Sequence, residues 1–295
     1  MDILEKIKKG KIKGYLTINK RIIFEGGVYH ITQRAPGKEY LFLEENDYLQ
    51  FLKVLKESVK KFNLELFCFS LLPNHLHLLL RINKENLSQA MKSLFERYAD
   101  YFNKKYKRKG HVFCGRYRAS ICNDDSYLLA ASVYIHLNPY RAGLCNHFKD
   151  YRWSSVVLYV ESSKKTFINF EIILFLFDSQ LDKARKKYSE MLEEDMKIKG
   201  SNLLDRSSIK IFIKRAANSA KKIIGKDKYL GDLDKLIEDF KSKKKVIIAK
   251  DRKARRYLAE QLLANGYSRQ EIRKILFIGK TTFYRIMNFR SGGTK

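Results

Sequence analysis

The sequence predicts an α+β protein, with a ferredoxin-like antiparallel sheet and its helices followed by an all-α C-terminal region that ends in a helix-turn-helix. Before residue 160, strand-like and helical segments follow one another as strand, helix, strand, strand, helix, strand, which is the order of a ferredoxin-like layer. After residue 160 no further strand pattern is convincing, and helical segments are separated by charged stretches. We therefore expect three parts: an α+β domain in residues 1–160, a helical connecting region in 161–240 and a basic helix-turn-helix domain in 241–295.

The first strands and the first helix follow from hydrophobic periodicity. The segment 26–35, "GGVYHITQRA", alternates and predicts a strand, whereas 46–62, "NDYLQFLKVLKESVKKF", has apolar residues at helical spacing. Two further strands, "LELFCFSLL" (64–72) and "HLHLLLRI" (75–82), are separated by the turn pair Pro73-Asn74. For the first helix we expect a buried stripe of Leu49, Leu52, Leu55 and Val59.

The rest of the predicted layer begins with a second helix in "NLSQAMKSLFERYADYF" (86–102). We expect Asn86 to cap this helix, with Gln89 as the reciprocal partner, above a buried stripe. The members of that stripe are Leu87, Met91, Leu94, Tyr98 and Phe102. The segment 111–122, "HVFCGRYRASIC", predicts another strand. A third helix in 123–139, "NDDSYLLAASVYIHLNP", should begin at Asp124 or Asp125 and end at Pro139, since the residue before proline disfavours the α region.

The C-terminal segment 257–290 has the pattern helix, helix, turn, helix. Ser268 and Glu271 predict a capping box for the middle helix. Apolar side chains at Ile272, Ile275, Leu276, Phe283 and Ile286 should face a small core. The last helix presents a basic outer face of Lys280, Thr281, Thr282 and Arg285, which favours insertion into the major groove of DNA over a plain three-helix packing unit.

The charge of the chain points to a polyanionic partner. Lys and Arg number 60 against 32 Asp and Glu, a formal net charge of +28. Nucleic acid is the favoured partner, with an anionic membrane surface as the alternative. No apolar run is long enough to span a bilayer, and the N-terminal segment lacks the apolar core of a signal peptide. We therefore expect a cytoplasmic, nucleoid-associated protein whose four cysteines, none in a CxxC pair, stay reduced.

The segment "LLPNHLHLLLR" (71–81) contains the most informative pair of residues. His75 and His77 stand one residue apart on a predicted strand, so both side chains point to one face, about 6 to 7 Å apart. They can be hydrogen-bonded core histidines, members of a zinc site with a cysteine such as Cys68, or two ligands of an open catalytic metal site. Spacing alone ranks the first and third readings equally. The remaining histidines, His30, His111, His136 and His147, stand singly, and for them we expect ordinary packing roles.

A helix near the middle of the chain offers further groups for a metal-dependent site. Tyr134 and Asn138 are four residues apart and therefore lie on one helical face. The residues one turn before Tyr134 are the small Ala130 and Ala131. A tyrosine above small residues and beside an amide oxygen suits a site, although packing is the ordinary role of a helical tyrosine.

Three motifs together, "LLPNHLHLLLR", "FCGRYR" and "YIHLNPYRAG…YRWSS", resemble those of the single-tyrosine transposases of the HUH superfamily, and among these the REP-associated tyrosine transposases. The resemblance covers roughly residues 20 to 160. It implies the HUH fold for this region, with His75 and His77 as the paired histidines. It also implies that Tyr134 is the nucleophile and that Asn138 completes the metal site. Tyr140 departs from the aliphatic residue that is more usual after "NP".

The resemblance implies a metal-dependent endonuclease and strand transferase acting in DNA transposition. Mg²⁺ or Mn²⁺ would be the cofactor, and a 5′-phosphotyrosine the intermediate. The substrate would be single-stranded DNA carrying a hairpin duplex, bound by a monomer or homodimer without membrane attachment. Arg116 and Arg118, alternating on one predicted strand, are further candidate DNA contacts. The alternatives are a domesticated transposase that acts as a non-catalytic DNA-binding regulator, and a metal-dependent hydrolase in which water attacks.

Overall fold

The computed structural model describes residues 23–122, 125–161, 166–197, 259, 268–276 and 278–288. Seven elements form its first part. They are β1 (Val28–Arg34), α2 (Glu45–Lys61), β2 (Leu64–Leu71), β3 (His75–Ile82), α3 (Leu87–Lys105), β4 (Arg118–Ile121) and α4 (Asp125–Arg141). The strand–helix–strand–strand–helix–strand order predicted from the sequence is confirmed, and so is a mixed α+β fold.

The four strands form one antiparallel sheet in the order β2-β3-β1-β4. This sheet order places β3 and β1 at the centre and leaves β4 as a short edge strand. The prediction of a strand over 111–122 was too long, because only Arg118–Ile121 pair with β1. Gly115 has a φ of 64° in the left-handed region, which bends the chain away from an extended path just before β4.

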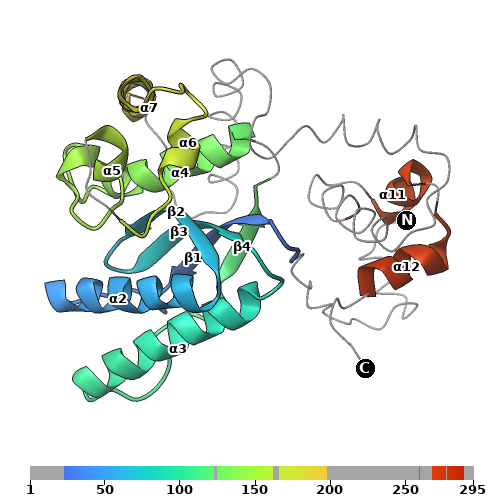
Figure 1. Cartoon of the computed structure of the whole chain (residues 1–295). Coiled ribbons are helices and arrows are strands. Elements are labelled where there is room, and N and C mark those ends of the chain that lie inside the picture. The colour runs from blue at the N-terminus through green and yellow to red at the C-terminus, as the bar shows by residue number, and fades with distance from the viewer. Residues whose placement is uncertain are drawn as a thin grey trace, which may run out of the picture.

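Helices cover both faces of the sheet (Figure 1). The helices α2 and α3 lie on one face, and α4 lies on the other together with α5 (Val157–Val160), α6 (Glu171–Leu174) and α7 (Leu181–Met196). Residues from 28 to 192 contribute to a single hydrophobic core, so α6 and α7 pack with the sheet as one body. The division of the chain into parts at residues 160 and 240 stays a prediction.

Helix α2 is rotated relative to the orientation that we predicted. Its buried side chains are Asp47, Tyr48, Phe51, Val54, Leu55 and Ser58, whereas Leu49 is 47% exposed. The predicted stripe was therefore wrong at Leu49, right at the buried Leu55, and partly right at Leu52 and Val59, which are half-buried against the core. The reason is that the aromatic rings of Tyr48 and Phe51 pack against Phe42, while hydrogen bonds satisfy the buried carboxylate of Asp47.

Helix α3 buries all five residues of its predicted stripe. Its predicted capping box is wrong, because Asn86 makes no side-chain capping hydrogen bond. The Asn86 amide instead donates to the carbonyl of Phe62, 2.9 Å away. This bond joins the start of α3 to the end of α2, so a contact between two elements has replaced a local cap.

Helix α4 is buried from Asp125 to Pro139 almost without interruption. We predicted that Pro139 ends this helix, and that is wrong, since the helix continues to Arg141 with Pro139 inside it. Pro139 lies in the last turn, where its missing N–H costs only one intrahelical hydrogen bond. The extra length keeps Asn138 in helical geometry, and the Asn138 carbonyl accepts a hydrogen bond from the amide of Ala142 at 2.9 Å.

The chain after α4 is fixed to the edge strand β2. Beyond a short turn of helix, η1 (Phe148–Asp150), the carbonyl of Trp153 accepts from the amide of Leu71, and the amide of Ser155 donates to Phe69. The Ser155 hydroxyl lies 2.9 Å from His136 Nε2, and His136 Nδ1 lies 2.8 Å from the Tyr188 hydroxyl. His136 is therefore a hydrogen-bonded core histidine, as we expected.

Two C-terminal helices, α11 (Arg269–Ile275) and α12 (Lys280–Asn288), surround a second small core. The predicted capping box of Ser268 and Glu271 is confirmed in both directions. The predicted core residues Ile272, Leu276, Phe283 and Ile286 are buried, and Ile275 is partly buried. Lys280 and Thr281 are exposed and Thr282 is partly exposed, whereas the side chain of Arg285 and most of the helix predicted before α11 lie outside the described residues. The helix-turn-helix and its DNA contacts stay predictions.

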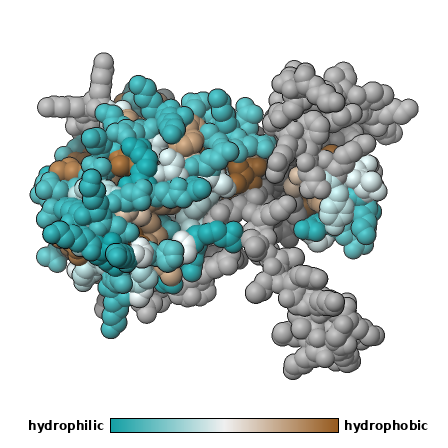
Figure 2. All heavy atoms as spheres, turned by 90° about the horizontal axis from the view of Figure 1, so that it is seen from below, coloured by the Kyte–Doolittle hydropathy of each residue, from teal (hydrophilic) through white to brown (hydrophobic). Residues whose placement is uncertain are grey.

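The described surface is mostly polar on the face that Figure 2 shows. Figure 2 views the molecule from the side of α3, where the described residues are mostly hydrophilic and hydrophobic side chains form small separate groups. None of the helices described is both long and apolar enough to cross a membrane. All four cysteines are free, as predicted, with Cys68 and Cys122 buried.

Candidate active site

His75 and His77 lie on one face of β3, as their spacing predicts. Their ring centroids are 5.1 Å apart and the rings are nearly perpendicular, at 87°. Both are buried, His75 being 4% exposed and His77 1%. The central position of β3 in the sheet fixes both backbones by hydrogen bonds on either side.

The Nδ1 atom of His77 is held from the neighbouring strand. It lies 2.9 Å from His30 Nε2 and 3.3 Å from Thr32 Oγ1, both on β1. The Nε2 atom of His77 is buried and has no hydrogen-bond partner among the described residues. The ring is therefore oriented through one nitrogen, and its other nitrogen stays available to a ligand.

We had assigned His30 an ordinary packing role, and that overlooked its contact with His77. His30 belongs to the site because antiparallel pairing places Thr32 opposite His77, which makes His30 the diagonal neighbour of His77. The alternation of His30 and Thr32 on a predicted strand was the only signal in the sequence, and its meaning depends on the strand register.

His75 is oriented in the same manner from its own turn. Its Nδ1 lies 2.7 Å from Asn74 Oδ1, and its Nε2 lies 3.0 Å from Asn138 Oδ1 on α4. An amide oxygen only accepts hydrogen bonds and a neutral imidazole carries one N–H, so neutral His75 donates either to Asn74 or to Asn138. With the proton on Nδ1, the lone pair of Nε2 would face the Asn138 oxygen, an arrangement that a cation beside both atoms would stabilise.

Tyr134 faces the histidines from α4. Its ring centroid lies 5.4 Å from that of His77 and 5.7 Å from that of His30, with edge-to-face geometry in both pairs. Asn138, one turn later, is 1% exposed and Tyr134 is fully buried. The structure thus brings together all four residues that the sequence singled out, His75, His77, Tyr134 and Asn138.

Burial sets the protonation of these groups. It lowers the pKa of His30 to about 4 and pulls the pKa of His75 below its usual value, although Asn138 opposes the shift. Burial together with the two neighbouring imidazoles puts the pKa of His77 well below the usual value. At neutral pH the imidazoles are therefore neutral, which is the form that binds metals.

Burial disfavours the ionised, reactive form of the Tyr134 hydroxyl. Burial raises its pKa, while a hydrogen bond with Asn138 and the positive charge of Arg141 pull the pKa down. A buried phenol is a poor nucleophile until a positive charge favours the phenolate. Among the described residues, Arg141 supplies positive charge that acts in that direction.

The donor set fits a divalent cation. His75 Nε2 lies 3.0 Å from the Asn138 amide oxygen, and the neighbouring ring of His77, 5.1 Å away between centroids, has an Nε2 without a partner among the described residues. No cluster of three or more His, Cys, Asp or Glu side chains suited to a metal occurs in the described part of the chain. A metal here would therefore need Asn138 or the substrate as a ligand, which is typical of an open catalytic site rather than a closed structural one.

Arg116 and Arg118, the two strand arginines predicted to contact DNA, are exposed. Arg118 stands on β4 directly across from Thr32, which in turn stands across from His77, so these three residues occupy one face of the sheet. Neighbouring strands are about 4.8 Å apart, which puts Arg118 about 10 Å from His77. Arg116 precedes β4 and lies in the bend after Gly115.

The sequence that forms this site also matches a family of known proteins. Residues 25–138 match the family model described as "Transposase IS200 like", a segment that begins before β1 and ends on Asn138. The resemblance to single-tyrosine transposases is therefore confirmed, and the matched segment contains all four residues of the candidate site.

Among individual proteins, the chain is similar to one described as "Putative REP-associated tyrosine transposase" from Haemophilus influenzae. The two are 27% identical over 149 residues, covering 46% of this chain and 83% of the relative. A solved REP-associated tyrosine transposase bound to a REP hairpin aligns with a TM-score of 0.43 and 15% identity, over 50% of this chain and 87% of that one.

Proposed function

We propose that this protein cleaves and rejoins single-stranded DNA through a covalent bond to Tyr134. The observation that carries the proposal is the packing of the Tyr134 ring against His77 and His30, beside a nitrogen atom of His77 that has no partner in the described structure. The match of residues 25–138 to IS200-like transposases supports a DNA-cleaving activity.

In the first step, the Tyr134 oxygen attacks the phosphorus of one phosphodiester. The bond from phosphorus to the 3′ oxygen breaks, and the phenolic proton is balanced by the proton that the departing 3′ oxygen takes up. The products are a 5′-phosphotyrosine and a free 3′-OH. In the second step a 3′-OH attacks the phosphotyrosine and releases the tyrosine, so strands are rejoined without a nucleotide cofactor.

Within this scheme, His75, His77 and Asn138 would hold a divalent cation, Mg²⁺ or Mn²⁺. When bound, such a cation offsets negative charge on the phosphate in the transition state. His30 and Thr32 hold the His77 ring through Nδ1, and Asn74 holds the His75 ring in the same manner. The charge of Arg141 favours the phenolate form of Tyr134.

The proposed substrate is a single strand adjoining a hairpin, as at repeated DNA elements. The net charge of +28 supports a nucleic-acid partner. The name of the Haemophilus relative, a REP-associated transposase, supports the choice of hairpin-bearing repeats. The exposed Arg118, on the same sheet face as His77, is suited to contact the phosphate backbone.

The decisive experiment is to trap the covalent adduct. The full-length protein is incubated with Mg²⁺ or Mn²⁺ and labelled single strands carrying a hairpin, and products are separated on a denaturing gel. We expect a labelled protein band that Tyr134→Phe abolishes and Tyr140→Phe, the same change on the same helix, preserves. Cleavage without any adduct would contradict the proposal and favour a hydrolase in which water attacks.

A second candidate is a DNA-binding regulator that retains the fold without cleavage. The complete burial of Tyr134 favours this alternative, since attack on a phosphate requires the packing around the hydroxyl to open. DNA binding with neither adduct nor cleavage, across hairpin substrates and both metals, is the result that a regulator predicts.

A further inference from the structure

A cavity of about 1090 Å³ adjoins the candidate active site. One part of its wall contains His75, Asn138 and Arg141, and a second wall region contains Arg152 and Trp153 of the "YRWSS" motif. The volume is slightly above the range of about 300 to 1,000 Å³ that is usual for ligand pockets. No residue of this second wall takes part in the proposed chemistry. The wall nevertheless lines the same cavity as the proposed metal ligands His75 and Asn138.

This second wall is a continuous stack of planar groups. Phe42 stacks on Tyr48 with centroids 4.3 Å apart and an interplanar angle of 20°. Tyr48 in turn stacks on Trp153 at 4.3 Å and 10°. The guanidinium of Arg152 lies over the Trp153 ring, 4.8 Å from its centroid, and forms the outermost layer.

The Arg152 guanidinium is held by an ion pair and is accessible to solvent. The Glu45 carboxylate lies 2.5 Å from the Arg152 guanidinium, whose side chain is nevertheless 64% exposed. Pairing with Glu45 offsets its charge, so the group is better suited to stacking than to capturing a phosphate. A planar guanidinium over an aromatic ring is a surface on which a nucleobase stacks.

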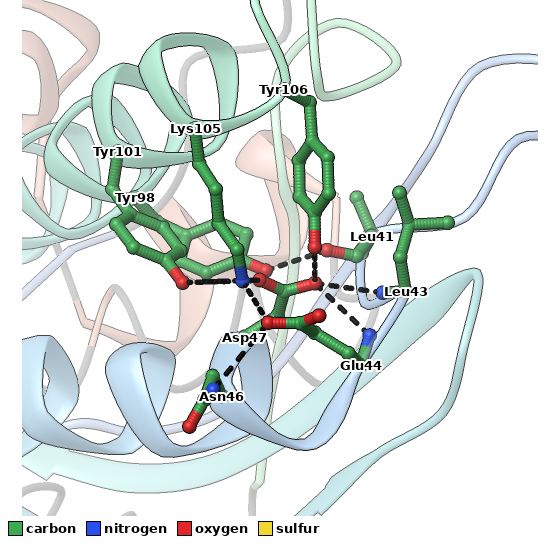
Figure 3. A network of polar contacts seen from close by, with 9 residues as sticks. All are labelled: Leu41, Leu43, Glu44, Asn46, Asp47, Tyr98, Tyr101, Lys105 and Tyr106. Carbon is green, nitrogen blue, oxygen red and sulfur yellow. Dashed lines mark hydrogen bonds and ion pairs between the residues drawn. The ribbon is translucent and has the colours of Figure 1, made fainter.

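The loop that carries Phe42 is held in place by the network in Figure 3. The buried Asp47 carboxylate accepts hydrogen bonds from the amides of Leu43 and Glu44, at 2.9 and 3.2 Å. Lys105 bridges Asp47 and Glu44, with 2.6 Å contacts to both. The stack is therefore present before any ligand binds, which reduces the entropy lost on binding.

Charge is distributed unevenly between the two walls. Arg141 lies on the wall with His75 and Asn138, whereas Glu44 and Glu45 belong to the wall with the stack. The positive charge of Arg141 attracts a phosphate to the first wall. On the second wall the carboxylates of Glu44 and Glu45 are paired with Lys105 and Arg152, so their charges offset one another and provide no such attraction. We therefore expect a nucleotide to bind with its phosphate toward His75 and its base toward Arg152.

We propose that this cavity binds one unpaired nucleotide of the DNA strand, next to the phosphate that Tyr134 attacks, and that its base stacks on the Arg152–Trp153 layer. This inference rests on the proposed function for the position of the reacting phosphate. It adds that the strand must be unpaired at this nucleotide, because a base within a duplex has both faces covered by its neighbours.

The test uses the fact that Trp153 is the only tryptophan of the chain, so its fluorescence reports on this cavity. Full-length protein is titrated with a dT12 strand, with a strand of the same length made of abasic sites, and with free dTMP. We expect dT12 to quench Trp153 at about tenfold lower concentration than the abasic strand, which has the same phosphates and no bases. Free dTMP should quench far more weakly.

Variants separate stacking from charge. We expect Arg152→Ala and Arg152→Lys both to bring the dT12 titration close to that of the abasic strand, because lysine keeps the charge and lacks the plane. Arg97→Ala, which removes an ion pair with Glu57 between α2 and α3, is the control that should leave the base dependence unchanged.

Four outcomes overturn the inference: equal quenching by dT12 and the abasic strand, no quenching by either, full base dependence in Arg152→Lys, and free dTMP as effective as dT12. These readings are independent of cleavage. Base-dependent quenching without any adduct would contradict the proposed function and leave the nucleotide site intact, whereas adduct formation without base-dependent quenching would do the reverse.

Discussion

The site depends, residue by residue, on how each imidazole is oriented. His77 is held through Nδ1 by His30 and Thr32, so that Nε2 is the nitrogen available to a cation. Partners of this kind fix the tautomer and the ring angle of a metal-binding histidine. His30 is thus a positioning residue, and its contribution can be measured separately from that of the proposed ligands.

We expect His30→Ala to weaken Mn²⁺ binding by about 10- to 100-fold while the protein stays folded, because the His77 ring loses its main partner. Calorimetric titration of the DNA-free protein with Mn²⁺ measures this directly. His111→Ala, at an exposed histidine, is the matched control. Unchanged Mn²⁺ affinity in His30→Ala would mean that His30 only fills space.

The proposed ligands themselves should be indispensable for cleavage. We expect a chelator to abolish strand cleavage and added Mg²⁺ or Mn²⁺ to restore it. His75→Ala or His77→Ala should remove most of the activity, with circular dichroism unchanged, since each removes one of the convergent donors. Full cleavage in the presence of the chelator would refute the metal role of His75, His77 and Asn138.

Between elements, polar groups hold the loop and helices that border the site. The carboxylate of Asp47 joins the start of α2 to the end of α3 through Lys105, Tyr101 and Tyr106. Burial pushes the pKa of Asp47 up, and the hydrogen bonds, above all that from Lys105, outweigh burial and bring the pKa below its usual value. The folded state therefore stabilises the ionised form.

We expect Asp47→Asn to lower the free energy of unfolding by about 2 kcal/mol at pH 7, because a charged acceptor of several hydrogen bonds is lost. A depressed folded-state pKa contributes stability that is present above the unfolded value and disappears as the pH falls through the folded value. The difference in the free energy of unfolding between wild type and variant should thus become smaller below about pH 4. Urea titrations across pH measure it, with Asp182→Asn, whose side chain is 99% exposed, as control. A difference that stays constant down to pH 2 would contradict the ionised role of Asp47.

At the scale of the whole molecule, the described residues form two hydrophobic cores, and we propose that the two ends of the chain have different functions in DNA binding and cleavage. The sheet with α2–α7 contains every proposed catalytic residue, and α11 and α12 surround a separate small core with an exposed Lys280. The predicted helix-turn-helix suits a duplex, whereas chemistry at Tyr134 needs a single strand.

We expect removal of residues 241–295 to weaken DNA binding and to flatten its salt dependence, because each lost phosphate contact removes about one unit of slope. The truncated protein should still form the Tyr134 adduct on a short single strand. Fluorescence anisotropy over a salt series and a denaturing gel provide the two measurements. A folded truncation that forms no adduct would make the tail part of the active site or of an assembly that completes it.

Short-range patterns in the sequence were sufficient to predict the secondary-structure elements from β1 to α4 and four residues of the candidate site. Alternation and helical spacing predicted the order of strands and helices from β1 to α4, and spacing alone put His75 and His77 on one strand face and Tyr134 and Asn138 on one helical face. These features have periods of a few residues, so they can be read from adjacent sequence. The motifs then indicated the family, which residues 25–138 match.

Only the tertiary structure decided which distant residues meet. His30 joins His77 through strand register, and Phe42, Tyr48 and Trp153 form one stack although more than a hundred residues separate the first from the last. The orientation of α2 was also decided there, because partners on α3 let Asp47 be buried while Leu49 stays exposed. Contacts between distant segments depend on how whole elements pack, and no short period in the sequence encodes that packing.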